Sequence, residues 1–243
     1  MKTTLNWEEF SPLFGTWADR IKPFFDKGGL DDVYKYLKKE SGRGKTIVPL
    51  SSNVFRCFSE TDYDELKVVL CGMSPYHTFR NKKPVADGLL MGCSTTGILQ
   101  PSLEQFYRAM EVEFHNGLEV HHAKSPDVSY LAHQGVLMLN ASLTCELFKA
   151  GSHLELWEPF MKFLFEEIIN PTGVPIVFLG RDAAKLEKYT MPIMGSFVFK
   201  ISHPASAAYS KTEWDSEGTF KKVNKILKER NGWEINWLQT DPF

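Results

Sequence analysis

Four apolar runs along the chain are predicted to form the strands of a buried sheet. They cover residues 67–71, 136–139, 175–179 and 197–201. The first contains an unbroken Val-Val-Leu-Cys stretch, which is typical of a strand covered on both faces. A sheet built from such strands would leave its polar residues at the strand ends.

Between these runs, apolar residues recur at three- and four-residue spacing, which predicts helices. The N-terminal stripe is interrupted at Pro23 and at 28–29, and a second helix is expected over 30–39. A later helix is expected after Pro101, with Ser102 as its N-cap. The N-terminal stripe consists of Trp7, Phe10, Phe14, Trp17 and Ile21. Further helices are expected over 155–169, 182–189 and 219–228. The segment after 197–201 reads as an irregular loop.

Strands that alternate with helical segments predict an α/β fold. We expect a three-layer α/β/α arrangement around a central, mainly parallel, four-stranded sheet. No linker or low-complexity tract divides the 243 residues, so the chain is interpreted as a single domain over 1–243. Residues 1–45 are expected to form a helical segment packed on that domain.

Three of the predicted strands end in polar side chains suited to chemistry. Ser74 follows the first strand, Asn140 ends the second and His203 follows the last. Gly72 permits a sharp exit from the first strand, and Pro75 stiffens the loop through its fixed φ. Because ligands of α/β folds sit at the carboxyl ends of parallel strands, these side chains form the candidate site.

The charge balance argues against one class of nucleic-acid protein. The chain has 28 Lys and Arg against 30 Asp and Glu, a formal net charge of -2. A protein that coats DNA without specificity would be basic throughout. Any nucleic-acid contact must therefore rest on a local patch and on backbone amides.

Cysteine usage and the chain ends suggest a compartment. Four cysteines lie far apart without a Cys-x-x-Cys pair, as expected of buried free thiols in a reducing compartment. The first ten residues have no apolar signal region, and no run of about 18 apolar residues is present. We expect a soluble intracellular protein in the cytoplasm, compatible with a prokaryotic or viral source, without a membrane partner.

The three strand-end segments, in this order, resemble motifs of the uracil-DNA glycosylase superfamily. The resemblance is closest to the family whose first motif reads Gly-Gln-Asp-Pro-Tyr-His, where this chain reads Gly-Met-Ser-Pro-Tyr-His at 72–77. The likeness runs from about Val48 to Trp237, through 53–55, 101–103, 134–140, 152–153, 157–160 and 235–237. It implies a monofunctional DNA glycosylase that hydrolyses the N-glycosidic bond of uracil or a related pyrimidine, leaving an abasic site.

The resemblance assigns two catalytic positions. In the family an aspartate acts near the sugar and a histidine stabilises the departing base; these fall on Ser74 and His203. A neutral imidazole can donate a hydrogen bond to a developing oxyanion. A serine hydroxyl can orient a water but cannot ionise to offset positive charge on the sugar. Asp87, in the neighbouring loop, is an alternative source of a carboxylate.

Base contacts are implied for Met73, Tyr76, Met91 and Asn140. The Asn140 side chain offers an acceptor and a donor, the pair needed to read the O4 and N3–H edge of uracil. Tyr76 would exclude a 5-methyl group. Met91 falls where the family stacks a phenylalanine on the base, and a thioether would cover that ring less rigidly.

Several loops would hold DNA according to the same resemblance. Arg181 would add a direct charge contact to phosphate. The family pushes a leucine into the duplex, but the ungapped match places Ala207 there, too small to fill the vacated stack, with Tyr209 as a substitute. Single-stranded or distorted DNA is therefore the expected partner. The implied DNA-binding residues are Pro101, Ser102, Gly180, Arg181, Ser206, Ala207 and Tyr209.

No metal and no organic cofactor are expected. His121, His122, His133 and His153 share no ligand spacing with a cysteine or carboxylate. The family chemistry needs only water besides the DNA. We expect a monomer, and a protein partner is retained as an option.

Two alternative interpretations remain open. Ser74 and the missing wedge leucine are also compatible with a catalytically silent relative that binds DNA or a protein. Met91, Ser74 and a loop at 78–87 about three residues longer than the family pattern are compatible with a glycosylase for 5-substituted pyrimidines, such as those of phage DNA. Tyr76 argues against the second.

Overall fold

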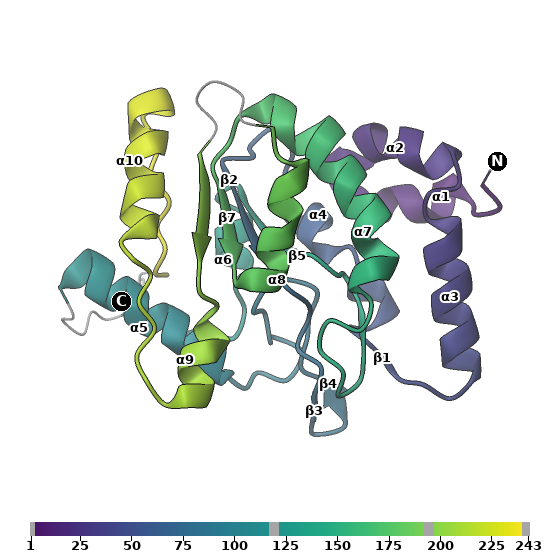
Figure 1. The fold of residues 1–243 in the computed structure, drawn as a ribbon, viewed down its shortest axis with the longest axis horizontal. Coiled ribbons are helices and arrows are strands. Elements are labelled where there is room, and N and C mark those ends of the chain that lie inside the picture. Colours follow the sequence, from purple (N-terminus) through teal and green to yellow (C-terminus); the bar gives the residue numbers. More distant parts are fainter. Residues whose placement is uncertain (1–2, 117–121, 192–196, 240–243) are drawn as a thin grey trace.

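Figure 1 shows the computed structural model, which describes residues 3–116, 122–191 and 197–239. A four-stranded sheet with the order β5-β2-β7-β8 lies at its centre. Its neighbouring strands pair in parallel throughout. The strands are β2 (Val68–Gly72), β5 (Val136–Asn140), β7 (Ile176–Leu179) and β8 (Val198–Ile201). The predicted α/β architecture is therefore confirmed.

The strand order reverses at β2. The chain leaves β2 to form β5 on one side, then returns across β2 to form β7 on the other. Such a reversal opens a crevice at the carboxyl ends of the strands. Gly72 and Asn140 are paired in register at this edge. The same end of the molecule carries the hairpin of β3 (Phe79–Arg80) and β4 (Lys83–Pro84), and α9 (Pro204–Ser210).

Helices cover both faces of the sheet. In Figure 1, α7 and α8 lie in front of the strands, whereas α4 and α6 lie behind them. α5 and α10 flank the β8 edge. The bounds are α4 (Arg56–Glu60), α5 (Pro101–His115), α6 (Ser129–Ala132), α7 (Leu154–Phe163), α8 (Arg181–Ala184) and α10 (Thr219–Asn231). A short antiparallel pair joins β1 (Ile47–Val48) to β6 (Cys145–Glu146).

The N-terminal segment packs its aromatic stripe into the core. It consists of α1 (Trp7–Phe10), a 3-10 turn over Ser11–Trp17, α2 (Ala18–Asp26) and α3 (Asp31–Gly42). The predicted break at Pro23 is wrong, because this proline lies inside α2. Its missing N–H removes one helical hydrogen bond, but Ile21 and Phe25 are buried and hold the helix on the core.

Two further local predictions are corrected. The segment after β8 is the helix α9, because Pro204 takes its first position and the His203 ring caps it by accepting from the Ala205 amide. The N-cap of α5 is Gln100 rather than Ser102. Ser102 lies inside the first turn, where its hydroxyl meets the Tyr76 hydroxyl instead.

The cysteines and the helix lengths can be compared with the expectations from the sequence. All four cysteines are buried and unpaired. Among the described helices, none is long and apolar enough to cross a membrane. His121, named above with the other histidines, lies outside the described residues.

Candidate functional site

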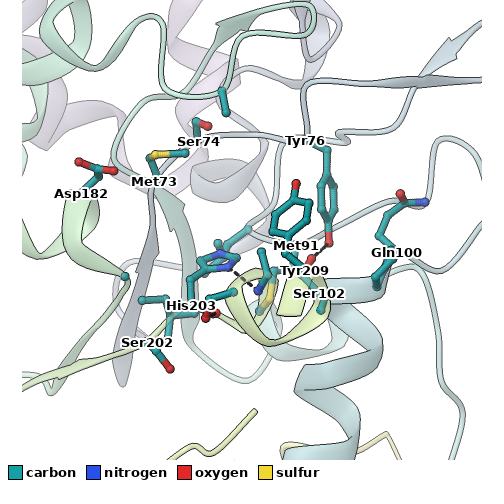
Figure 2. Close-up of a pocket in the computed structure, with 18 of the residues that line it drawn as sticks. Met73, Ser74, Tyr76, Met91, Gln100, Ser102, Asp182, Ser202, His203 and Tyr209 are labelled. Carbon is teal, nitrogen blue, oxygen red and sulfur yellow. Dashed lines mark hydrogen bonds between the residues drawn. The ribbon is translucent and has the colours of Figure 1, made fainter. Parts of the chain in front are cut away.

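A pocket of about 920 Å³ opens at the carboxyl ends of the strands (Figure 2). Its walls come from the loop after β2, the start of α5, the β7–α8 turn and α9. Asn140 and Ala207, two of the predicted site residues, do not line it. The predicted residues that do are Met73, Ser74, Tyr76, Met91, Pro101, Ser102, Gly180, Arg181, His203, Ser206 and Tyr209.

Asn140 and His203 nevertheless converge on one point above Gly72. A Cβ added to Gly72 would lie 3.5 Å from Asn140 Oδ1 and 3.6 Å from His203 Nε2. It would also overlap Leu90 Cδ1, at 2.4 Å. Gly72 is therefore needed for this close approach of two strand ends, and Leu90 packs against the same point.

The Asn140 side chain carries an unsatisfied acceptor. Its Oδ1 is buried and has no hydrogen-bond partner among the described residues. Such an atom costs about 1–3 kcal/mol when nothing binds it. Leu90, packed on Gly72, lies beside it and lines the pocket. No motif singles out Leu90, because it reads as one more apolar residue of a buried run.

His203 is held in the neutral form with one nitrogen left free. Its Nδ1 accepts from the Ala205 amide at 3.0 Å, so the ring proton resides on Nε2. Burial lowers the pKa of His203 to about 4. Gly180 leaves room for His203, because a Cβ there would lie 3.2 Å from His203 Cβ. An uncharged N–H donor is thereby available at the pocket.

Ser74 is tethered to the loop that precedes α7. Its Oγ accepts from the Gly151 amide at 3.0 Å, and the side chain is half-buried at the pocket wall. One lone pair and the hydroxyl proton remain available. The group can hold a water but cannot act as an effective base.

Tyr76 and Met91 form rigid parts of the wall. The Tyr76 hydroxyl lies 2.5 Å from Ser102 Oγ (Figure 2), and burial raises the pKa of this tyrosine. Met91 is buried with a φ of 59°, a conformation that is uncommon without glycine and recurs at functional sites. Ser102 is thus occupied as a partner of Tyr76.

The rim combines an exposed aromatic ring with an exposed cation. Tyr209 on α9 is 81% exposed, whereas Ala207 is buried in the same helix. Ala207 therefore cannot reach into DNA, and the wedge interpretation falls to Tyr209. Arg181 is exposed at the start of α8 and lines the pocket. Ser206 donates its hydroxyl to the His203 carbonyl at 2.7 Å.

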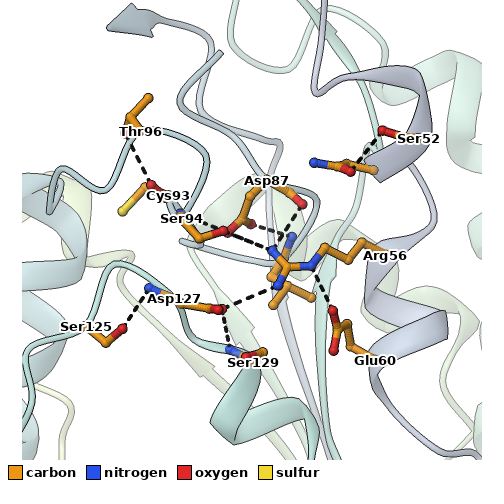
Figure 3. Close-up of polar contacts among 12 residues, drawn as sticks. Ser52, Arg56, Glu60, Asp87, Cys93, Ser94, Thr96, Ser125, Asp127 and Ser129 are labelled. Carbon is orange, nitrogen blue, oxygen red and sulfur yellow. Dashed lines mark hydrogen bonds and ion pairs between the residues drawn. The ribbon is translucent and has the colours of Figure 1, made fainter. Parts of the chain in front are cut away.

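Asp87, the alternative carboxylate, belongs to a different cluster (Figure 3). It pairs with Arg56 at 2.9 Å and accepts from the Ser94 amide and hydroxyl and the Leu89 amide. Arg56 also pairs with Glu60. The carboxylate is 1% exposed and does not line the pocket. Asp87 therefore holds the loop in place and supplies no acid to the site.

Within the described residues, no three His, Cys, Asp or Glu side chains gather so that they could hold a metal ion. His153 instead meets the Thr144 hydroxyl at 2.9 Å, and that hydroxyl accepts from Trp157 Nε1. Burial lowers the pKa of His153. His153 thus belongs to a buried framework beneath the Ser74 loop.

The chain is similar to known proteins in sequence and in fold. A family model for the uracil DNA glycosylase superfamily matches residues 58–228. The uracil-DNA glycosylase of Francisella tularensis subsp. tularensis is 28% identical over 226 residues, 91% of this chain and 98% of the relative. The uracil-DNA glycosylase of Pseudomonas paraeruginosa is 29% identical over 235 residues, which cover 94% of this chain and 96% of the relative. The fold matches the crystal structure of mimivirus uracil-DNA glycosylase with a TM-score of 0.79, at 22% identity over 96% of this chain and 89% of that one.

Proposed function

The chain belongs to the uracil DNA glycosylase superfamily, and from this membership we propose that it hydrolyses the N-glycosidic bond of uracil in DNA. One observation carries the proposal. An unsatisfied Asn140 oxygen and a free His203 N–H meet at the same point. Uracil presents a donor at N3 and carbonyl oxygens beside it, so one ring would satisfy both groups. Leu90, which lines the pocket, packs against this point.

Departure of the base is assisted by His203. As the glycosidic bond breaks, its electron pair passes to the base, and negative charge develops on the base oxygens. The Nε2–H of a neutral imidazole donates to such an oxygen without transferring its proton. A hydrogen bond prearranged in a buried site contributes most when the charge develops. The low pKa of His203 keeps this donor uncharged at physiological pH.

Water attack falls to the Ser74 side of the pocket. We assign to Ser74 the place of the family aspartate, so that its hydroxyl orients the water that bonds to the sugar carbon as the base leaves. The proton released by this water passes to solvent. The tether of Ser74 to Gly151 fixes the hydroxyl oxygen. With no carboxylate at position 74, positive charge on the sugar is offset by DNA phosphates and by the departing base. We expect a rate below that of an otherwise equal site with a carboxylate.

Base selection follows from the pocket wall. Tyr76 is held by Ser102, so its ring cannot swing away without losing a buried hydrogen bond. We assign to it the exclusion of a 5-methyl group, and to Met91 and Met73 the packing around the base. Tyr209 and Arg181 at the rim are assigned to a flanking base and to a phosphate.

The experiment is an excision assay on single- and double-stranded oligonucleotides that contain one uracil. Abasic sites are scored by alkaline cleavage, with His203→Ala as the matched control. We expect cleavage at uracil, none at thymine, and a higher rate on the single strand. Cleavage no greater than that of the control would refute the proposal. Parallel substrates with 5-substituted uracils test the alternative substrate class, and release of these alone would favour it.

A further inference from the structure

The β3–β4 hairpin concentrates positive charge at the pocket mouth. Asn81 and Lys82 form its two-residue turn, with φ values of 51° and 60°. The register places Arg80 directly opposite Lys83. Like charges paired across strands destabilise a hairpin. A two-stranded hairpin this short has little else to hold it, so the arrangement favours an anionic partner from outside the chain.

No carboxylate of the described chain neutralises these cations. Arg80, Lys82 and Lys83 are exposed, and none has a carboxylate oxygen within 4.0 Å among the described residues. Some surface lysines elsewhere are paired, such as Lys124 with Glu111 and Lys185 with Asp182. In a chain of net charge -2, this hairpin is a local basic patch of the kind that phosphates bind.

An exposed aromatic residue stands beside the hairpin. Phe148 is 70% exposed and has a φ of 66°. Its amide donates to the His77 carbonyl at 2.7 Å, two residues before the hairpin begins, and Figure 1 shows the β6–α7 loop next to β3 and β4. A bulky residue in this conformation is strained. The exposed ring gains little from packing to offset that strain, which points to a ligand.

The geometry of the pocket connects this patch to the proposed chemistry. Arg80, His77 and Ala150 line the pocket on the side of the Ser74 loop. Tyr209 lines it from α9. A strand that places one nucleotide in the pocket would therefore run on over the hairpin.

We propose that the hairpin and Phe148 bind the DNA strand that flanks the extruded nucleotide. Arg80, Lys82 and Lys83 contact its phosphates, and Phe148 stacks on one unpaired base. The proposal rests on the proposed function, because it uses the same pocket. It specifies single-stranded DNA, since an exposed ring can stack only on a base released from its duplex.

The salt dependence of binding tests the cations. The triple variant Arg80→Gln, Lys82→Gln, Lys83→Gln is compared with Lys27→Gln, Lys35→Gln, Lys39→Gln, which removes the same charge from the N-terminal helices. Binding of a labelled single-stranded oligonucleotide without uracil is followed by fluorescence anisotropy at several salt concentrations. Each lost phosphate contact lowers the slope of log K against log salt by about 0.7. We expect a loss of about 2 for the hairpin variant and none for the control; equal slopes would overturn the proposal.

Phe148 is tested by Phe148→Asn and Phe148→Tyr. Asparagine tolerates the left-handed conformation, so Phe148→Asn should melt at the same temperature as the parent or higher. Its affinity for the single strand should fall roughly fivefold to a hundredfold, the effect of losing one stacked base. Tyrosine should preserve binding. An Asn variant that binds as the parent does, or that loses stability instead, would overturn the role of Phe148.

These measurements are separable from the test of excision. They use DNA without uracil and need no turnover, so an inactive protein can still show the altered slope. If the hairpin variant has a normal excision rate and an unchanged slope of log K against log salt, the proposed function is retained and this inference is refuted. A slope change on duplex alone would overturn the single-strand assignment.

Discussion

Two buried polar clusters near the sheet differ in whether their groups are satisfied. Around Asp87, the carboxylate is matched by Arg56 and by donors from Ser94 and Leu89. Beside the pocket, Asn140 Oδ1 has no hydrogen-bond partner among the described residues, and His203 Nε2 lies near the same point above Gly72. Buried polar groups are normally satisfied. The complete cluster therefore serves the fold, and we propose that the incomplete one binds a ligand.

The contrast corrects a choice that residue types alone favour. By residue type alone, a carboxylate is better suited to hydrolysis than a serine, and Asp87 lies only 13 positions after Ser74. The surroundings of Asp87 exclude this role, because its carboxylate is already paired with Arg56 and hydrogen-bonded to Ser94 and Leu89.

Removing the Asp87 carboxylate should unfold the protein more readily. Asp87→Ala leaves Arg56 without its buried partner, and breaking such a pair costs about 3–5 kcal/mol of stability. Urea denaturation would measure it. Asp26→Ala is the control, because that exposed carboxylate pairs only with Lys22 at the surface and should cost under about 1 kcal/mol. Similar losses for both variants would remove the structural role of Asp87.

Supplying an acid at Ser74 should raise activity. In Ser74→Asp a carboxylate oxygen can accept from Gly151, as the hydroxyl does, and a positioned carboxylate contributes roughly 10²–10⁴ in rate. Single-turnover uracil excision would show the gain, with Ser74→Asn as the uncharged control. An inert parent that Ser74→Asp activates would identify a scaffold that recognises the base but has lost its chemistry. No gain would show that Ser74 does not take the place of the family aspartate.

Loss of the His203 donor should reduce the rate without reducing stability much. Removing one such donor costs about 10²–10³ in kcat, so His203→Ala should fall by that factor. The ratio of the fall in kcat to the change in KM distinguishes a role in bond cleavage from one in binding. A fall confined to KM would reassign His203 to binding.

The pH profile checks the protonation state of the same residue. Burial lowers the pKa of His203 from 6.5 to about 4, so the neutral ring favours the folded state above pH 6.5. That contribution is lost as pH falls from 6.5 through 4. We expect kcat to show no step near pH 6.5 and to decline near pH 4. A step near 6.5 that disappears in His203→Ala would contradict the neutral donor.

Replacing Asn140 by leucine should give the smallest change in stability and the opposite sign to Asp87→Ala. Asn140→Leu removes a buried unsatisfied oxygen, so the free energy of unfolding should stay the same or rise by up to about 3 kcal/mol. Uracil excision should be lost. A marked loss of stability would place Asn140 among the structural residues.

The sequence pattern was sufficient to locate the strands, but it did not predict the contacts that the residues at their ends make. Apolar runs located the four central strands, and Gly72 and Asn140 are register partners as strand-end residues should be. The pattern did not reveal that α9 forms after His203. Pro204 at its first position was a usable signal, but capping by the His203 ring required coordinates.

The sequence predicted which residues belong to the candidate site, but not which of them reach the pocket or the solvent. Most of its named residues line one pocket. Ala207 does not, because it lies on the buried face of α9, whereas Tyr209 lies on the exposed face. Leu90 beside Asn140, and the charges opposed across the β3–β4 hairpin, depend on packing and register. Such features are invisible to motif and composition.

The most direct measurement is a crystal structure with a short single-stranded oligonucleotide that contains 2′-fluoro-2′-deoxyuridine, whose glycosidic bond resists cleavage. We predict that Asn140 Oδ1 and His203 Nε2 each lie about 2.7–3.2 Å from atoms of one uracil ring. A uracil bound elsewhere, or a bound strand with Asn140 still covered and unpartnered, would contradict the assignment of this pocket.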